Sequence, residues 1–207
     1  MKHEWKKKEK QYYQPKQKPE LVQIPCFKFF SIHGQGNPNH PEFSNYIEAL
    51  YSLSYAIRMS PKKGMAPEGY FEYTVYPLEG VWDLTDEAKM NFTGKINKDD
   101  LVFDLMIRQP DFVSASYAKD IIEVVKKTKS NPMLDHVNII EVEEGNCVQM
   151  LHVGSYDDEP STFQLMEEYT DSIGLKRVSK IHREIYLSDA RKVAPEKLKT
   201  ILRFQVK

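Results

Sequence analysis

The stretch Phe27–Gly34, FKFFSIHG, returns in altered form as Cys147–Gly154, CVQMLHVG, at an offset of 120 residues (147 − 27). Both runs are rich in large apolar residues, which favours β-strands. At the same offset Phe43 corresponds to Phe163, and each of these residues lies in a segment with helical spacing of apolar side chains. The two halves of the chain therefore begin alike, with a strand followed by a helix.

Two further matches extend the repeat. Tyr70–Val75 corresponds to Ile181–Tyr186, so that Tyr73 and Glu184 are equivalent, and Leu105–Arg108 corresponds to Thr200–Arg203. Each half thus reads strand, helix, strand, strand. We predict an α+β fold, a tandem pseudo-twofold repeat of these modules with an antiparallel sheet and a cleft at the seam between them.

The expected organisation has three parts. Residues 1–18 are basic and contain Pro15, with Pro19 directly after them, which predicts a mobile, extended arm. Residues 19–207 form a single domain of two halves, about 19–112 and 135–207, joined by a linking helix that Ser114 caps. A hairpin is expected at Glu144-Gly145-Asn146, and Gly174 is expected to close a helix that starts at Glu159.

Composition excludes several classes of protein. The chain has 207 residues and a net charge of −1, so nothing marks it as a nucleic-acid binder. Two distant cysteines, Cys26 and Cys147, make neither a disulfide framework nor a metal cluster, and no motif requires a metal or an organic cofactor. No apolar run is long enough to span a membrane, which predicts a soluble, cytoplasmic protein.

The stretch Lys180–Asp189, KIHREIYLSD, carries the candidate site. As a strand it directs His182, Glu184 and Tyr186 to one face, while the opposite face is mostly apolar. A carboxylate between two rings must be paired, shift its pKa, or await a ligand. The alternative is an edge strand with His182 and Glu184 in water.

The order of motifs resembles the GyrI-like small-molecule-binding domain family, which also supplies the effector half of multidrug-sensing transcription activators. The motifs that carry the resemblance are Pro19–Val22, Phe29–Gly36, Pro41–Phe43, Tyr73–Gly80, Met106–Pro110, Leu151–Tyr156, Glu184–Asp189 and Ala194–Arg203. They look closest to the stand-alone branch of the family, since no helix-turn-helix segment is present. Ala190 departs from the proline that such sequences carry after Ser-Asp.

The resemblance implies an aromatic cleft in which the glutamate of the E-I-Y motif, here Glu184, attracts cationic aromatic ligands. Similar stand-alone members are linked to hydrolysis of the strained cyclopropane ring of DNA-alkylating cyclopropanoids. A carboxylate among rings can act as the base for water, and a tyrosine can donate to the developing oxyanion. Glu184 is therefore our candidate base and Tyr73 our candidate donor. Candidate ligand-binding residues are Tyr55, Trp82, Phe112 and Tyr186 as walls, with Glu79 and Arg108 as secondary candidates.

Two other functions remain open at this stage. A non-catalytic binder or sensor of hydrophobic cationic or aromatic drugs would use Glu184 and the rings in the same way. A gyrase-inhibitor-like interaction protein would need an exposed apolar or acidic patch, for which Asp157-Asp158-Glu159 is the local candidate. Acidic residues at the start of a helix explain that run equally well. The expected partner is a planar aromatic small molecule, with no membrane or nucleic acid.

Overall fold

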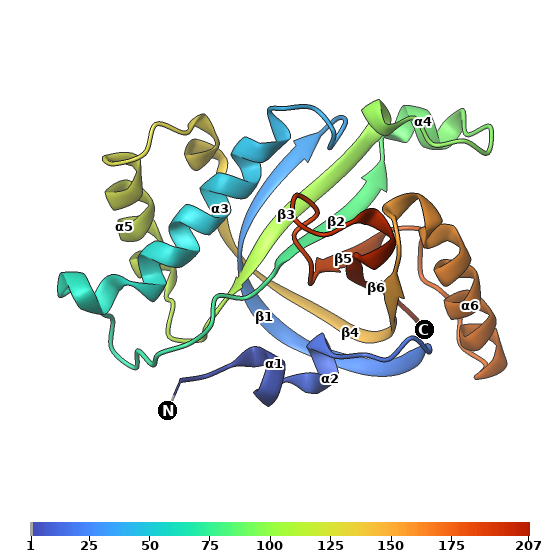
Figure 1. Cartoon of the computed structure of the whole chain (residues 1–207), viewed down its shortest axis with the longest axis horizontal. Helices are drawn as coiled ribbons and strands as arrows, with labels where there is room; N and C mark the ends of the chain where they lie inside the picture. Colours follow the sequence, from blue (N-terminus) through green and yellow to red (C-terminus); the bar gives the residue numbers. More distant parts are fainter. Residues whose placement is uncertain (1) are drawn as a thin grey trace. The chain divides into compact units, whose positions relative to one another are not determined.

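The computed structural model describes residues 2–207, which divide into two compact units. Unit 1 comprises the residues up to 4, 27–78 and 82–142, and unit 2 comprises residues 5–26, 79–81 and 143–207. The helices and strands, labelled in Figure 1, are α1 Trp5–Lys8, α2 Lys10–Tyr13, β1 Glu20–Gln35, α3 Phe43–Arg58, β2 Leu78–Leu84, α4 Asp86–Met90, β3 Leu101–Gln109, α5 Ala115–Lys126, β4 Asn138–Val153, α6 Glu159–Ser172, β5 His182–Tyr186 and β6 Lys199–Gln205. The predicted α+β class is confirmed. None of the helices in these residues is both long and apolar enough to cross a membrane.

Unit 1 is built on β1 and β3, which pair antiparallel with Phe29 opposite Arg108. Helix α3 contacts β3 and α5, and its apolar residues Leu50, Leu53 and Ile57 are fully buried. The predicted linking helix is α5, and its cap is confirmed, because the Ser114 hydroxyl accepts a hydrogen bond from the backbone N–H of Tyr117.

Unit 2 is built on the antiparallel strands β4, β6 and β5, in that order. Helix α6 contributes Met166 to a core that it shares with Val148 of β4 and Leu202 and Phe204 of β6. Gly174 follows α6 with a φ of +74°, a conformation that glycine adopts without steric cost. The predicted closure of this helix by Gly174 is confirmed.

The two ladders have equivalent registers, which confirms the predicted correspondences of the first and last strands; the equivalence of Tyr73 and Glu184 is not confirmed, because β2 begins only at Leu78 whereas Glu184 lies within β5. Phe29 faces Arg108 in unit 1, and Gln149 faces Arg203 in unit 2. The offsets are 120 on the first strand and 95 on the second (149 − 29 and 203 − 108), as the sequence alignment predicted. The next residues along the strands keep the same offsets. The expected cleft at the seam stays a prediction.

The expected hairpin at Glu144-Gly145-Asn146 is wrong. Strand β4 continues through this segment, from Asn138 to Val153. Gly145 has a φ of +66°, so the glycine absorbs a local departure from extended backbone without reversing the chain. The strand predicted over residues 70–82 is also shorter than expected, because regular pairing begins at Leu78, after Pro77.

The N-terminal segment is not the extended arm that its composition predicted. Residues 5–13 form α1 and α2, in which Trp5 and Tyr13 are only 5% and 2% exposed and lie with their ring centroids 5.0 Å apart. The Gln149 side chain donates to the Gln11 carbonyl (2.7 Å), and Arg203 donates to the Tyr12 carbonyl (2.8 Å). Burial of the rings and these bonds to backbone carbonyls fasten the segment within unit 2.

A buried ionic network occupies the core of unit 2. Arg183 of β5 pairs with Glu79 (2.8 Å) and Glu144 (2.9 Å), and Glu144 also pairs with Arg203 (3.1 Å). Burial raises the pKa of Glu79 above its usual value despite the attraction of Arg183. For Glu144 burial acts in the same direction, but the two arginines outweigh it and lower its pKa. The β5 face that was expected to be mostly apolar thus carries Arg183, a buried cation paired with two carboxylates.

Candidate functional site

Glu184 lies in the middle of β5 with only 8% of its surface exposed, so the alternative of a solvated edge position is wrong. Tyr186 Oη donates to Glu184 Oε2 at 2.8 Å, and His182 Nε2 lies 3.2 Å from Glu184 Oε1. The alternation of side chains along a strand places these three residues on one face, as predicted. Each oxygen of the carboxyl group is therefore held by a different ring.

A second carboxyl group, from Glu159, lies beside Glu184. Glu159 is the first residue of α6 and is 6% exposed. One ligand atom each from Glu159, His182 and Glu184 lies within 4.8 Å of the others. Burial and the adjacent Glu184 raise the pKa of Glu159 to about 10. At neutral pH Glu159 therefore keeps its proton in the ion-free protein. We call Glu159, His182 and Glu184 the acidic cluster.

Aromatic rings surround the acidic cluster. Tyr156 meets the ring of Tyr186 edge-on, with centroids 6.0 Å apart, and Phe163 of α6 meets the His182 ring at 4.7 Å. Burial and the charge of Glu184 raise the pKa of Tyr156 to about 12, so its hydroxyl remains a donor at neutral pH. The cluster thus combines ring surfaces with a carboxyl pair and a hydroxyl donor.

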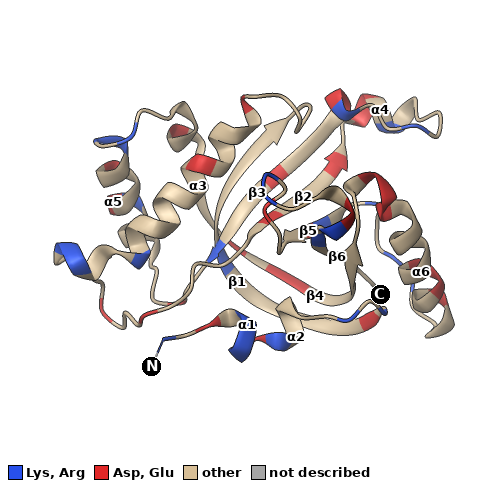
Figure 2. Ribbon diagram, viewed as in Figure 1, with Lys and Arg blue, Asp and Glu red and all other residues tan. Residues whose placement is uncertain are grey.

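Sequence reasoning missed Glu159, Tyr156 and Phe163 as parts of the site. The acidic run Asp157-Asp158-Glu159 precedes and begins α6, where Figure 2 shows it in red, and the helix start was a sufficient explanation for it. The structure separates its members, since Asp157 and Asp158 are exposed and Glu159 is buried. Only two of the three acidic residues, Asp157 and Asp158, could therefore contribute to an exposed patch for a gyrase-like partner.

Tyr73, the candidate donor, lies in unit 1 and is buried. Its hydroxyl is 3.5 Å from the Ser54 carbonyl oxygen, and burial raises its pKa well above the usual range. The structure brings it together with Phe112, another predicted site residue, at a ring-centroid distance of 5.9 Å. Tyr70 and Phe71 also contact Phe112, so these residues form an aromatic group within unit 1.

The remaining predicted aromatic residues, Trp82 and Tyr55, have neighbours other than the acidic cluster. Trp82 is buried in unit 1 among Phe43 and Phe103, as a core residue is. Tyr55 is 54% exposed and lies against Tyr51. The two charged candidates, Arg108 and Glu79, also have partners within the protein.

Arg108 stacks on aromatic rings, with its guanidinium carbon 3.4 Å from the Phe27 ring centroid and 4.6 Å from that of Tyr76. Glu79 lies in the buried ion pair with Arg183. A ligand-binding role for either residue stays a prediction.

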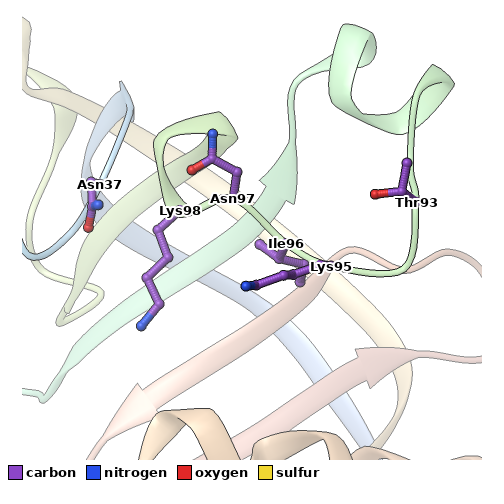
Figure 3. Close-up of a pocket in the computed structure, with 6 residues that line it drawn as sticks. All are labelled: Asn37, Thr93, Lys95, Ile96, Asn97 and Lys98. Carbon is purple, nitrogen blue, oxygen red and sulfur yellow. The ribbon is translucent and has the colours of Figure 1, made fainter.

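A surface hollow lies elsewhere, in unit 1. Figure 3 shows its lining residues, Asn37, Thr93, Lys95, Ile96, Asn97 and Lys98. None of the predicted site residues lines it. Its side chains come mainly from the loop before β3 and offer amides and amines but no acid–base pair. The hollow therefore does not compete with the acidic cluster as a catalytic site.

Comparison with known proteins gives the chain its family. The sequence model of the GyrI-like small molecule binding domain matches residues 17–207. Two structures described as hydrolases from Listeria innocua are 36% and 35% identical to the chain, with TM-scores of 0.89 and 0.91, and each comparison covers 100% of both chains. The EcmrR C-terminal domain, at 14% identity, a TM-score of 0.51 and coverage of 92% of this chain and 97% of that one, shares the fold. No curated protein matches significantly. The predicted resemblance is thus confirmed, and the chain belongs to the GyrI-like small-molecule-binding domain family.

Proposed function

We propose that this protein binds planar aromatic small molecules at the acidic cluster and hydrolyses the strained cyclopropane ring of cyclopropanoid DNA-alkylating compounds. Such a reaction would protect a cell from genotoxic natural products. The observation that carries the proposal is the buried carboxyl group of Glu184, which Tyr186 orients and aromatic rings surround. The similarity to two structures described as hydrolases, over the whole chain, supports an enzyme.

The chemistry needs a base and a proton donor. The oxygen of a water molecule forms a bond to a cyclopropane carbon while Glu184 accepts the water proton. The ring C–C bond breaks, and its electron pair passes through the conjugated system to the carbonyl oxygen. That oxygen then takes up a proton, so that the net change is the addition of one water. A protonated phenol can supply that proton, and Tyr73, in unit 1, stays a prediction for this role.

The arrangement of Glu184 favours its role as the base. Oε2 is occupied by the Tyr186 hydroxyl, so the carboxyl group is fixed in one rotation, with Oε1 beside His182 Nε2. A fixed acceptor lowers the entropic cost of aligning water with the reacting carbon. The surrounding rings also limit the access of bulk water, which strengthens electrostatic interactions in the site.

Mass spectrometry of a cyclopropanoid incubated with the purified protein tests this function. The wild type should add one water to the drug, and Glu184→Gln should not, because the amide cannot accept the proton. Glu168→Gln is the matched control, since Glu168 is an exposed glutamate on α6 of the same unit. Intact drug after incubation with the wild type would contradict the hydrolase assignment.

A non-catalytic binder of hydrophobic cations is the second candidate. It is favoured by the same acidic cluster, because a carboxylate among rings attracts an aromatic cation without any chemistry. Equilibrium dialysis separates the two functions. A binder returns the drug unchanged and loses affinity in Glu184→Gln, whereas the hydrolase releases the hydrated product.

A further inference from the structure

We propose that Glu159, His182 and Glu184 form a binding site for a divalent transition-metal ion, for which Zn²⁺ is the best-suited ion. This inference does not depend on any substrate, and an ion held by Glu184 Oε1 would compete with the proposed role of that oxygen as a base. It concerns the composition and geometry of the acidic cluster itself. The three side chains come from two elements of unit 2, the start of α6 and strand β5.

The distances suit a small ion. A ligand atom from each residue lies within 4.8 Å of the other two. His182 Nε2 and Glu184 Oε1 are 3.2 Å apart, close to the roughly 3.3 Å that separates neighbouring ligands at ordinary Zn–N and Zn–O bond lengths in a tetrahedral site. Only a modest movement of the Glu159 side chain is needed to complete three ligands.

Neighbouring groups already orient two of the ligands. His182 Nδ1 lies 3.3 Å from the Lys180 carbonyl oxygen, which favours a proton on Nδ1 and leaves the Nε2 lone pair for the ion. Tyr186 occupies Glu184 Oε2, so Oε1, which lies 3.2 Å from His182 Nε2, is the carboxyl oxygen that faces the other ligands. Metal-binding histidines and carboxylates in proteins have outer partners of this kind.

The third ligand supplies an independent observation. Glu159 Oε1 is buried and has no hydrogen-bond partner. Within residues 2–207, no lysine or arginine forms an ion pair with Glu159 or Glu184. A buried carboxyl oxygen without a donor is costly, and a cation beside it removes that cost. The described residues thus supply no positive charge to the acidic cluster, and a bound ion would replace the proton of Glu159.

The ligand set selects the ion. One imidazole nitrogen and two carboxyl oxygens suit Zn²⁺, whereas Ca²⁺ takes six to eight oxygen ligands and Mg²⁺ keeps several waters in an octahedral shell. Three protein ligands also leave a coordination position open, as in catalytic zinc sites. Water or a polar ligand atom would occupy it.

Calorimetric titration of the full chain, after treatment with a chelator, tests the site. We expect one Zn²⁺ per chain and no comparable binding of Mg²⁺. Glu159→Gln and His182→Asn should abolish saturable Zn²⁺ binding. His33→Asn is the matched control, because His33 forms an exposed pair with Asp104 at 2.9 Å and should leave Zn²⁺ binding unchanged. Circular dichroism and thermal unfolding of each variant show that it folds.

A second variant probes the orienting role of Tyr186. Tyr186→Phe should weaken Zn²⁺ binding roughly 10- to 100-fold and alter the visible spectrum of the Co²⁺-substituted protein. Absence of saturable Zn²⁺ binding by the wild type, or full binding by Glu159→Gln, would overturn the proposal. Because no cyclopropanoid enters this experiment, its failure and the failure of the proposed hydrolysis are separate results.

Discussion

The hydroxyl of Tyr186 donates a 2.8 Å hydrogen bond to Glu184 Oε2, so the tyrosine of the E-I-Y motif fixes the orientation of its glutamate. The bond fixes the orientation of the carboxyl group, and so the position of Oε1, at which a water molecule or a ligand would bind. We predict that Tyr186→Phe lowers kcat for cyclopropanoid hydrolysis by roughly 10- to 100-fold, the worth of one hydrogen bond to a charged group.

Steady-state kinetics measure this effect. Tyr169→Phe is the control, because Tyr169 packs its ring against the core of unit 2 and its loss of a hydroxyl should leave kcat unchanged. Equal kcat values for Tyr186→Phe and wild type would show that Glu184 needs no orienting partner.

The buried network of Arg183, Glu79, Glu144 and Arg203 makes a prediction about stability. Glu144 joins the two arginines, at 2.9 and 3.1 Å, so Glu144→Gln leaves buried Arg203 without a carboxylate partner and Arg183 with Glu79 alone. We expect a loss of about 3–5 kcal/mol in the free energy of unfolding, as for other broken buried pairs. Urea denaturation measures it. Asp135→Asn, which removes the exposed partner of Lys126, should cost less than about 1 kcal/mol.

The same carboxyl group determines the response to acid. Arg183 and Arg203 hold the pKa of Glu144 below its ordinary value of 4.5, although burial opposes them. The stabilisation from Glu144 is therefore fully present above pH 4.5 and is lost as the pH falls through the lower pKa of the folded state. Thermal unfolding between pH 2 and 6 should show this decline in the wild type and a shallower one in Glu144→Gln. The exposed neighbour variant Glu143→Gln should follow the wild type.

Most of the fold could be predicted because the alternation of apolar side chains that marks a strand is contained in a few neighbouring residues. FKFFSIHG and CVQMLHVG carry their alternation in eight residues, and the register that follows from their alignment is the one in both ladders. Gly145 misled the prediction, since a glycine between polar residues indicates a turn as readily as an irregular position within a strand.

The candidate site could be predicted only in part. Glu184, His182 and Tyr186 are two residues apart on one strand, so their common face follows from the sequence. The position of Glu159 beside them depends on how α6 packs on the sheet, which no local pattern encodes. Arg183 was placed on a packing face for a similar reason, because its partners Glu79 and Glu144 are distant in sequence.

The two cysteines should differ in reactivity. Cys147 is fully buried on β4, and burial raises the pKa of its thiol to about 12, whereas Cys26 is exposed. Because the thiolate is the reactive form, the native protein should react rapidly with one equivalent of a thiol reagent such as DTNB. Cys26→Ser should abolish this reaction, and unfolding in guanidinium should restore reaction at Cys147. Rapid reaction of native Cys26→Ser would contradict the burial of Cys147.

The N-terminal segment should behave as part of the folded protein. Trp5 and Tyr13 bury their rings, and the carbonyls of Gln11 and Tyr12 accept hydrogen bonds from Gln149 and Arg203. Replacing the indole in Trp5→Ala removes a large share of the apolar contact that holds α1 and α2 in unit 2. Trypsin should then cleave after Lys16 faster than in the wild type, because proteolysis follows the population of locally opened chain. Lys7→Ala, an exposed change on the same short helix, should leave the cleavage rate unaltered. If the wild type is already cleaved after Lys16 as fast as Trp5→Ala, the segment is open in solution and its burial adds little to stability.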